Sequence, residues 1–140
     1  MKATLNNTEL AVLNARLTGV SFCQIDDFKK SWHIDQIMLK AAAIAGCSLP
    51  NTDFFANVIA EELTHFILNL NKGELTYEEI LLSLRLNSTG GYRFPSGLEM
   101  EQITFFGNCF NIDYFSKVAA NYMLVRNQLD RKLQNFIDGY

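Results

Sequence analysis

The residues best suited to bind a metal are a glutamate and a histidine three positions apart, Glu62 and His65, with Glu61 beside them. On a helix this spacing places both side chains on one face, as in di-iron bundles. Those centres use two such motifs and two further glutamates on facing helices. The chain has one motif, and its second histidine, His33, lies in the unrelated sequence WHIDQ. We therefore expect no metal site, and an enzyme that binds a small molecule or a metal through Glu62 and His65 is an alternative.

A nucleophilic catalyst needs a serine or cysteine beside a base that a third group holds in place. The chain contains no Gly-x-Ser-x-Gly sequence, and its cysteines are Cys23, Cys47 and Cys109. Cys109 lies near an expected helix start, where a thiol can become reactive, but a structural thiol is the simpler interpretation. The odd number and wide spacing of the cysteines favour buried thiols in a reducing compartment over a disulfide framework. The sequence thus predicts no catalytic residue, no cofactor and no enzyme activity.

The segment Asn87–Gly97, NSTGGYRFPSG, has two adjacent glycines and a proline, which predict a long loop. It lacks the lysine and the preceding strand of a phosphate-binding P-loop. Tyr92, Arg93 and Phe94 can form a short β-ribbon within it, and aromatic and arginine side chains anchor protein interfaces or stack on single-stranded bases. We predict that these three residues bind a partner, and the alternative is that they cover the core.

The last expected helix, from Ile112 to about Ile137, carries apolar residues every three or four positions. This stripe is longer than a small bundle usually needs, so the C-terminal end of the helix is predicted to dimerise or to dock a partner helix. Packing along the whole length is the alternative. Tyr122, Arg126 and Arg131 of this helix are predicted to contribute to partner binding.

The hydrophobic periodicity and the capping signals predict helices over most of the chain. The clearest start is Thr76-Tyr-Glu-Glu79, a capping box. The fold class is therefore all-α, an irregular bundle of about five or six helices in a single domain over residues 1–140, with one long Gly-rich loop. The expected helices are 9–18 capped by Thr8, 26 or 27–45, 51 to 53 onward to Gly73, 77–86, a short one within 98–106, and 112–137 capped by Asn111.

The net charge of −3 is unevenly distributed along the chain. Residues 51–115 carry nine acidic and three basic side chains, a net charge of −6, which opposes contact with a phosphate backbone. The last helix is mildly basic, so a nucleic-acid contact is weakly supported there alone. A DNA-binding regulator with an atypical helix-turn-helix, formed by residues 77–86 and the helix after Asn111, is an alternative. Its connecting loop is far longer than the usual turn of about 3–4 residues.

The sequence also bears on where the protein works. The first ten residues contain one lysine and no apolar segment typical of a signal peptide. No apolar run approaches the roughly 20 residues of a membrane span. Together with the cysteine pattern, these features predict a cytoplasmic protein that makes no membrane contact.

The segment from Leu75 to Arg126 resembles a pattern in small helical proteins of phages and conjugative elements. The matching pieces are the capped helix LTYEEI, the TGGY loop, the stretch ITFFG, and a helix carrying Tyr122 and Arg126. The resemblance implies a helicase-loader-like accessory of DNA replication. Because the chain has no ATP-binding motif, any loader role would have to be nucleotide-free. The leading hypothesis is therefore a non-enzymatic helical protein-interaction module of a mobile genetic element, with an unidentified protein partner.

Overall fold

The computed structural model describes residues 5–90, 92–93, 99–100, 102–105, 107 and 109–138. Helices dominate these residues, which confirms the all-α class. The α-helices are α1 (Asn7–Thr18), α2 (Asp27–Ala45), α3 (Asp53–Asn69), α4 (Tyr77–Ser88) and α5 (Ile112–Asp138). Two short 3-10 helices, η1 (Phe22–Gln24) and η2 (Leu70–Gly73), and two short strands, β1 (Tyr92–Arg93) and β2 (Glu99–Met100), complete the described elements.

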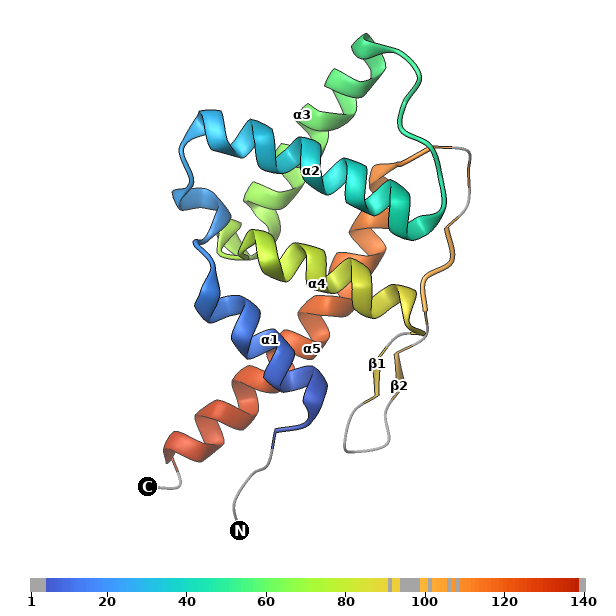
Figure 1. Cartoon of the computed structure of the whole chain (residues 1–140). Helices are drawn as coiled ribbons and strands as arrows, with labels where there is room; N and C mark the ends of the chain where they lie inside the picture. The colour runs from blue at the N-terminus through green and yellow to red at the C-terminus, as the bar shows by residue number, and fades with distance from the viewer. Residues whose placement is uncertain are drawn as a thin grey trace.

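Helix α4 lies at the centre of the bundle, where it contacts α1, α2 and α5. Figure 1 shows α5 running obliquely behind α4 and α1, while α2 crosses in front of α3, whose N-terminal end extends beyond it. The most buried large side chains come from η1, α2, α3, α4, α5 and the segments before α4 and α5, and they include Phe22, Ile37, Leu63, Leu84 and Tyr122. The core is therefore shared by all the long helices, with Val12 contributed by α1. None of the described helices is long and apolar enough to cross a membrane.

Side-chain caps explain where the helices begin. Thr76 accepts a hydrogen bond from the Glu79 backbone N–H at 3.0 Å, and the Glu79 carboxylate accepts one from the Thr76 N–H at 3.3 Å, so the predicted capping box is confirmed. Helix α1 uses a second capping box, between Asn6 and Glu9, and therefore starts two residues earlier than a Thr8 cap predicts. Helix α2 ends at Gly46 in the left-handed conformation, with φ of 77°, as its sequence predicts.

The segment after α4 differs from the prediction. Tyr92–Arg93 pairs antiparallel with Glu99–Met100, so the ribbon predicted at Tyr92 and Arg93 is confirmed, but residues 99–100 are a strand and not part of a short helix. Residues 102–105 are also non-helical. The reason lies in Asn87, whose amide accepts from the Ile103 N–H at 2.8 Å and donates to the Ile103 carbonyl at 3.1 Å. These bonds satisfy backbone groups that a helix would otherwise pair.

Candidate functional site

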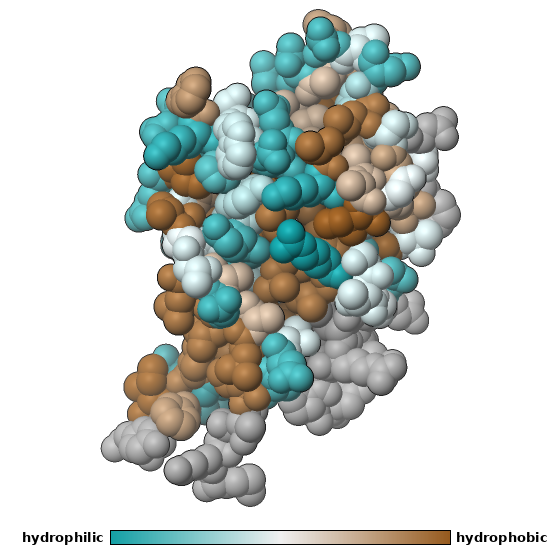
Figure 2. Space-filling model, viewed as in Figure 1, coloured by the Kyte–Doolittle hydropathy of each residue, from teal (hydrophilic) through white to brown (hydrophobic). Residues whose placement is uncertain are grey.

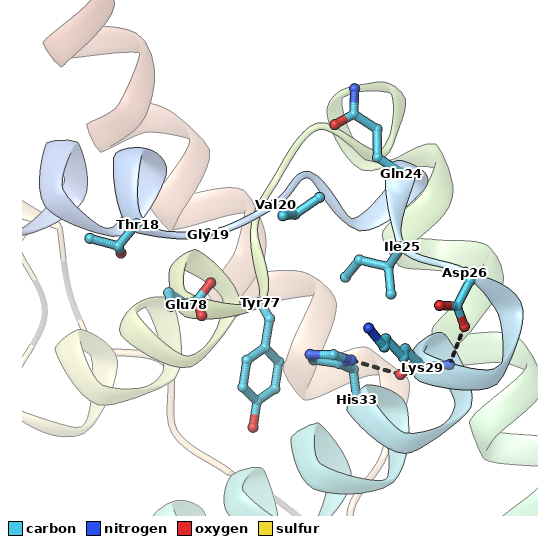
Figure 3. A pocket seen from close by; sticks show the side chains of 10 residues that line it. All are labelled: Thr18, Gly19, Val20, Gln24, Ile25, Asp26, Lys29, His33, Tyr77 and Glu78. Carbon is cyan, nitrogen blue, oxygen red and sulfur yellow. Dashed lines mark hydrogen bonds between the residues drawn. The ribbon is translucent and has the colours of Figure 1, made fainter.

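A pocket of about 380 Å³ opens where the end of α1, η1, the start of α2 and the start of α4 meet (Figure 3). Its walls combine charged, aromatic and aliphatic side chains from these four elements. The residues that line it are Thr18, Gly19, Val20, Gln24, Ile25, Asp26, Lys29, His33, Tyr77 and Glu78. No residue predicted from the sequence as a partner-binding or metal-binding residue is among them.

Backbone pairing attaches the α1–η1 connection to the segment that precedes α4. Ser21 forms an antiparallel bridge with Thr76, and the Phe22 N–H donates to the Leu75 carbonyl at 2.8 Å. Gly19 makes this close approach possible, because a Cβ there would lie 2.8 Å from the Thr76 Cβ and 2.0 Å from Glu78 Oε2. Its backbone is extended, with φ of −121°, so the glycine is needed for space and not for a left-handed turn.

The first turns of α2 position two basic side chains on the pocket wall. Asp26 caps the helix by accepting from the Lys29 N–H at 2.9 Å. Lys29 and His33 are four residues apart and therefore share a face of α2. His33 Nδ1 lies 2.6 Å from the Lys29 carbonyl oxygen. A carbonyl oxygen can only accept, so Nδ1 carries the hydrogen and Nε2 stays available to a ligand.

An aromatic cluster fixes the floor of the pocket. The His33 ring lies edge-on to Tyr77, with ring centroids 4.6 Å apart, and edge-on to Trp32, at 5.0 Å. Trp32 and Tyr77 are 6.3 Å apart. Lys40 completes the cluster by donating from Nζ to the Tyr77 hydroxyl at 3.0 Å, with Nζ 5.4 Å from the ring centroid. The orientations of His33 and Tyr77 are thus set by packing and hydrogen bonding before any ligand binds.

Three charged side chains line the pocket: Lys29, Glu78 and Asp26, whose carboxylate caps α2. Figure 3 shows Lys29 on the α2 side and Glu78 on the α4 side, separated by the cavity. Within the described part of the chain, neither side chain forms an ion pair or side-chain hydrogen bond, and His33 Nε2 also has no partner. The pocket therefore offers a cation, an anion and an imidazole nitrogen to solvent.

Exposed apolar side chains lie in the pocket wall or next in sequence to residues that line it, and we call Leu17, Val20, Phe28 and Trp32 the rim. They are 76%, 56%, 87% and 54% exposed, respectively. Figure 2 shows apolar surface along η1 and α1, which continues over the C-terminal end of α5. The apolar periodicity of residues 26–45 includes Phe28 and Trp32 and predicts that both are buried. This prediction is wrong, because α2 buries the face of Ile34, Ile37 and Met38 instead.

Two of the predicted partner-binding residues, Tyr122 and Arg126, lie in the interior of the structure. Tyr122 is fully buried and Arg126 is 7% exposed. Both bind Glu79, with Tyr122 Oη at 2.7 Å and Arg126 Nε at 2.9 Å from Glu79 Oε2. Their Tyr-x-x-x-Arg spacing therefore serves to join α5 to α4, and neither side chain reaches a surface that a partner can contact.

The other predicted partner-binding residues lie elsewhere. Arg131 is exposed on α5, two turns before its end. Tyr92 and Arg93 form β1 opposite Met100 and Glu99. Phe94 lies outside the described residues. None of these residues lines the pocket, so the sequence prediction and the pocket are two separate surfaces.

Most basic side chains of α5 already form ion pairs with acidic residues of this chain. Of its four basic residues, Arg131 has no ion pair within the described ranges. The other three pair with acidic residues: Arg126 with Glu79 at 2.9 Å, Lys132 with Glu9 at 2.7 Å and Lys117 with Asp113 at 3.0 Å. Helix α4 is also largely covered by its neighbours. This arrangement does not favour the helix-turn-helix alternative.

The predicted metal and thiol candidates remain apart. Glu62 and His65 are both exposed on α3, and no group of three or more His, Cys, Asp or Glu side chains able to hold a metal occurs among the residues that the structure describes. All three thiols are free. Cys23 is exposed, contrary to the expectation of buried thiols. Burial raises the pKa of the Cys47 thiol, and the nearby Cys109 raises it further.

Comparison with known protein families, curated protein sequences and solved structures gives no match to this chain. The resemblance of residues 75–126 to accessory proteins of mobile elements therefore stays a prediction.

Proposed function

We propose that this chain is a non-enzymatic helical module that binds another protein through the rim around the pocket. The observation that supports the proposal is the exposure of Phe28 and Trp32, which lie four residues apart and form one ridge on α2. Full burial of a phenylalanine side chain contributes about 1.5–3 kcal/mol, and aromatic anchors dominate the energetics of many interfaces. Leu17, in the last turn of α1, and Val20, which follows that helix, are further exposed apolar side chains of the rim.

The partner surface that fits this ridge is the apolar face of a helix. Ridges formed by residues four apart pack into the grooves between such rows on a second helix. An amphipathic helix laid along α2 would cover Phe28 and Trp32 and reach Val20 across the mouth of the pocket. The polar pocket beneath the rim would then be enclosed by the partner.

The test compares two exposed phenylalanines that differ in position. Phe28 is 87% exposed on the rim, and Phe54 is 79% exposed at the start of α3, so neither aspartate substitution disturbs the core. Wild type, Phe28→Asp and Phe54→Asp proteins are used as bait in host lysate, and captured proteins are quantified by mass spectrometry. We expect a protein that the wild type and Phe54→Asp retain and that Phe28→Asp loses. Equal recovery with both variants, or no protein above background, contradicts the proposal.

We further propose that the partner belongs to the replication machinery of a mobile genetic element, on the strength of the resemblance at residues 75–126. Recovery of a replicative helicase or another replication protein in the same experiment supports this part, and recovery of an unrelated protein contradicts it. Tyr92, Arg93 and Phe94, together with Arg131, are proposed as a second contact. The double variant Arg93→Ala, Phe94→Ala tests this second contact. Unchanged capture of every partner by the double variant contradicts it.

A further inference from the structure

We propose that the pocket between α1, α2 and α4 binds a small zwitterion of the α-amino acid type. In this assignment Lys29 pairs with the carboxylate of the ligand, while Glu78 and His33 Nε2 accept hydrogen bonds from its ammonium group. The inference is independent of the protein partner proposed above. It concerns the charged side chains of the pocket, whereas the partner contacts the apolar rim, and Val20 is the one residue common to both.

The charge arrangement is the first argument. Lys29 and Glu78 stand on opposite walls of one cavity, and neither has an ion-pair partner within the described residues. A ligand with a single charge would satisfy one of them and be repelled by the other. A ligand that carries both charges satisfies both, and charge-assisted hydrogen bonds are stronger than neutral ones.

The protonation of His33 is the second argument. Because Nδ1 donates to the Lys29 carbonyl, the neutral imidazole presents Nε2 as an acceptor. An acceptor suits an ammonium group and opposes a second carboxylate. The Tyr77 hydroxyl binds Lys40 Nζ at 3.0 Å, and Figure 3 shows it pointing away from Lys29 and Glu78. Glu78 and His33 thus form the accepting side of the pocket, and Lys29 supplies its cation beside the Asp26 carboxylate that caps α2.

Size and polarity are the third argument. The cavity of about 380 Å³ is near the lower end of the range for small-molecule pockets, roughly 300–1,000 Å³, so it suits a ligand of amino-acid size. Val20 and Ile25 line the same cavity and provide an apolar wall for an aliphatic side chain. Gly19 keeps the space beside Glu78 Oε2 free of a side chain.

The chain contains its own reporter for a binding experiment. Trp32 is the single tryptophan, and its ring lies 5.0 Å from that of His33 and 6.3 Å from that of Tyr77. The probes are leucine, N-acetylleucine, which keeps only the carboxylate, and leucinamide, which keeps only the ammonium. We expect a saturable change of tryptophan fluorescence with leucine and at least about tenfold weaker binding of the other two, because each loses one charge-assisted contact. No saturable change with leucine, or equal binding of N-acetylleucine or leucinamide, overturns the proposal.

Matched variants test whether the charges of Lys29 and Glu78 bind the ligand. Lys29→Gln and Glu78→Gln remove one charge each from the pocket, and Lys72→Gln and Glu62→Gln remove the same charges from exposed positions outside it. The pocket variants are expected to weaken leucine binding about tenfold, whereas the controls leave it unchanged. Equal effects of pocket and control variants contradict the assignment. Phe28→Asp is expected to keep leucine binding, so failure of the rim proposal and failure of this one give different results.

Discussion

Two adjacent glutamates at the start of α4 have opposite environments. Glu79 is completely buried and binds three partners: the Thr76 N–H at 3.3 Å, the Tyr122 hydroxyl at 2.7 Å and Arg126 Nε at 2.9 Å. Glu78 is exposed on the wall of the pocket and has no such partner in the described residues. Adjacent side chains on a helix point about 100° apart, so one turn of α4 supplies both a structural and an available carboxylate.

The contrast separates charges that hold the fold from charges that are free to bind. A buried charge is tolerated only when it is paired and hydrogen-bonded, and the Glu79 network meets that condition while joining α4 to α5. Helix α1 is joined to α5 by two further ion pairs, Lys132 with the buried Glu9 at 2.7 Å and the partly exposed Arg16 with Asp130 at 2.7 Å. Unpaired charges in a concave surface have no such structural use, which is why the pocket is the better place to look for ligand binding.

The largest expected effect is that of Glu79→Gln on stability. The substitution keeps the shape of the side chain but leaves Arg126, which is 7% exposed, without its counter-charge. Breaking a buried pair in this way costs about 3–5 kcal/mol. Urea denaturation followed by circular dichroism measures the change. A loss of stability below about 1 kcal/mol would show that the hydrogen bonds and ion pair of Glu79 do not hold the fold together.

Tyr122→Phe tests the same network by removing one hydroxyl. The Tyr122 hydroxyl donates to the Glu79 carboxylate at 2.7 Å in the buried core. A hydrogen bond to a charged group contributes about 1.5–3 kcal/mol, and phenylalanine preserves the packing. We expect a loss in that range by the same denaturation assay. In the Glu79→Gln background the loss should be smaller, and equal losses in the two backgrounds would indicate that the groups act independently.

Gly19→Ala tests the contact between the α1–η1 connection and α4. The added Cβ would lie 2.8 Å from the Thr76 Cβ, which is part of the α4 cap, and 2.0 Å from Glu78 Oε2, which can move. Overpacking of this kind costs about 1–3 kcal/mol. Thermal unfolding measures the loss of stability in Gly19→Ala. Adding Glu78→Ala should restore only the part of that loss that comes from the clash with Glu78. Complete recovery of stability in the double variant would show that the contact with Thr76 adjusts without cost.

Local signals in the sequence predicted much of the fold and little of the site. The capping box at Thr76 and Glu79, the cap Asn111 and the stop at Gly46 depend on neighbouring residues, and the structure has all three. The pocket depends on which face of α2 is buried, and its broad apolar stripe did not distinguish the face of Phe28 and Trp32 from that of Ile34 and Ile37. Tertiary packing makes that choice, so sequence periodicity alone could not find the pocket.

The same limit explains the assignment of Tyr122 and Arg126. Both residue types anchor interfaces, but they also neutralise buried carboxylates. The partner that decides between these roles is Glu79, more than 40 positions earlier in the chain. A pairwise contact over that distance leaves no trace in local spacing. The one available signal was that Glu79 is a cap residue just before a strongly apolar segment, which favours burial.

The smallest expected effect is that of Glu78→Gln on stability, and it completes the comparison. Glu78 is exposed and unpaired within the described residues, so the free energy of unfolding should change by less than about 0.5 kcal/mol. Urea denaturation beside Glu79→Gln provides the direct contrast between neighbouring carboxylates. A loss comparable to that of Glu79→Gln would mean that Glu78 also holds the fold. A small loss, combined with weaker leucine binding, would place its role in the pocket, because a side chain that binds a ligand without stabilising the protein changes affinity alone.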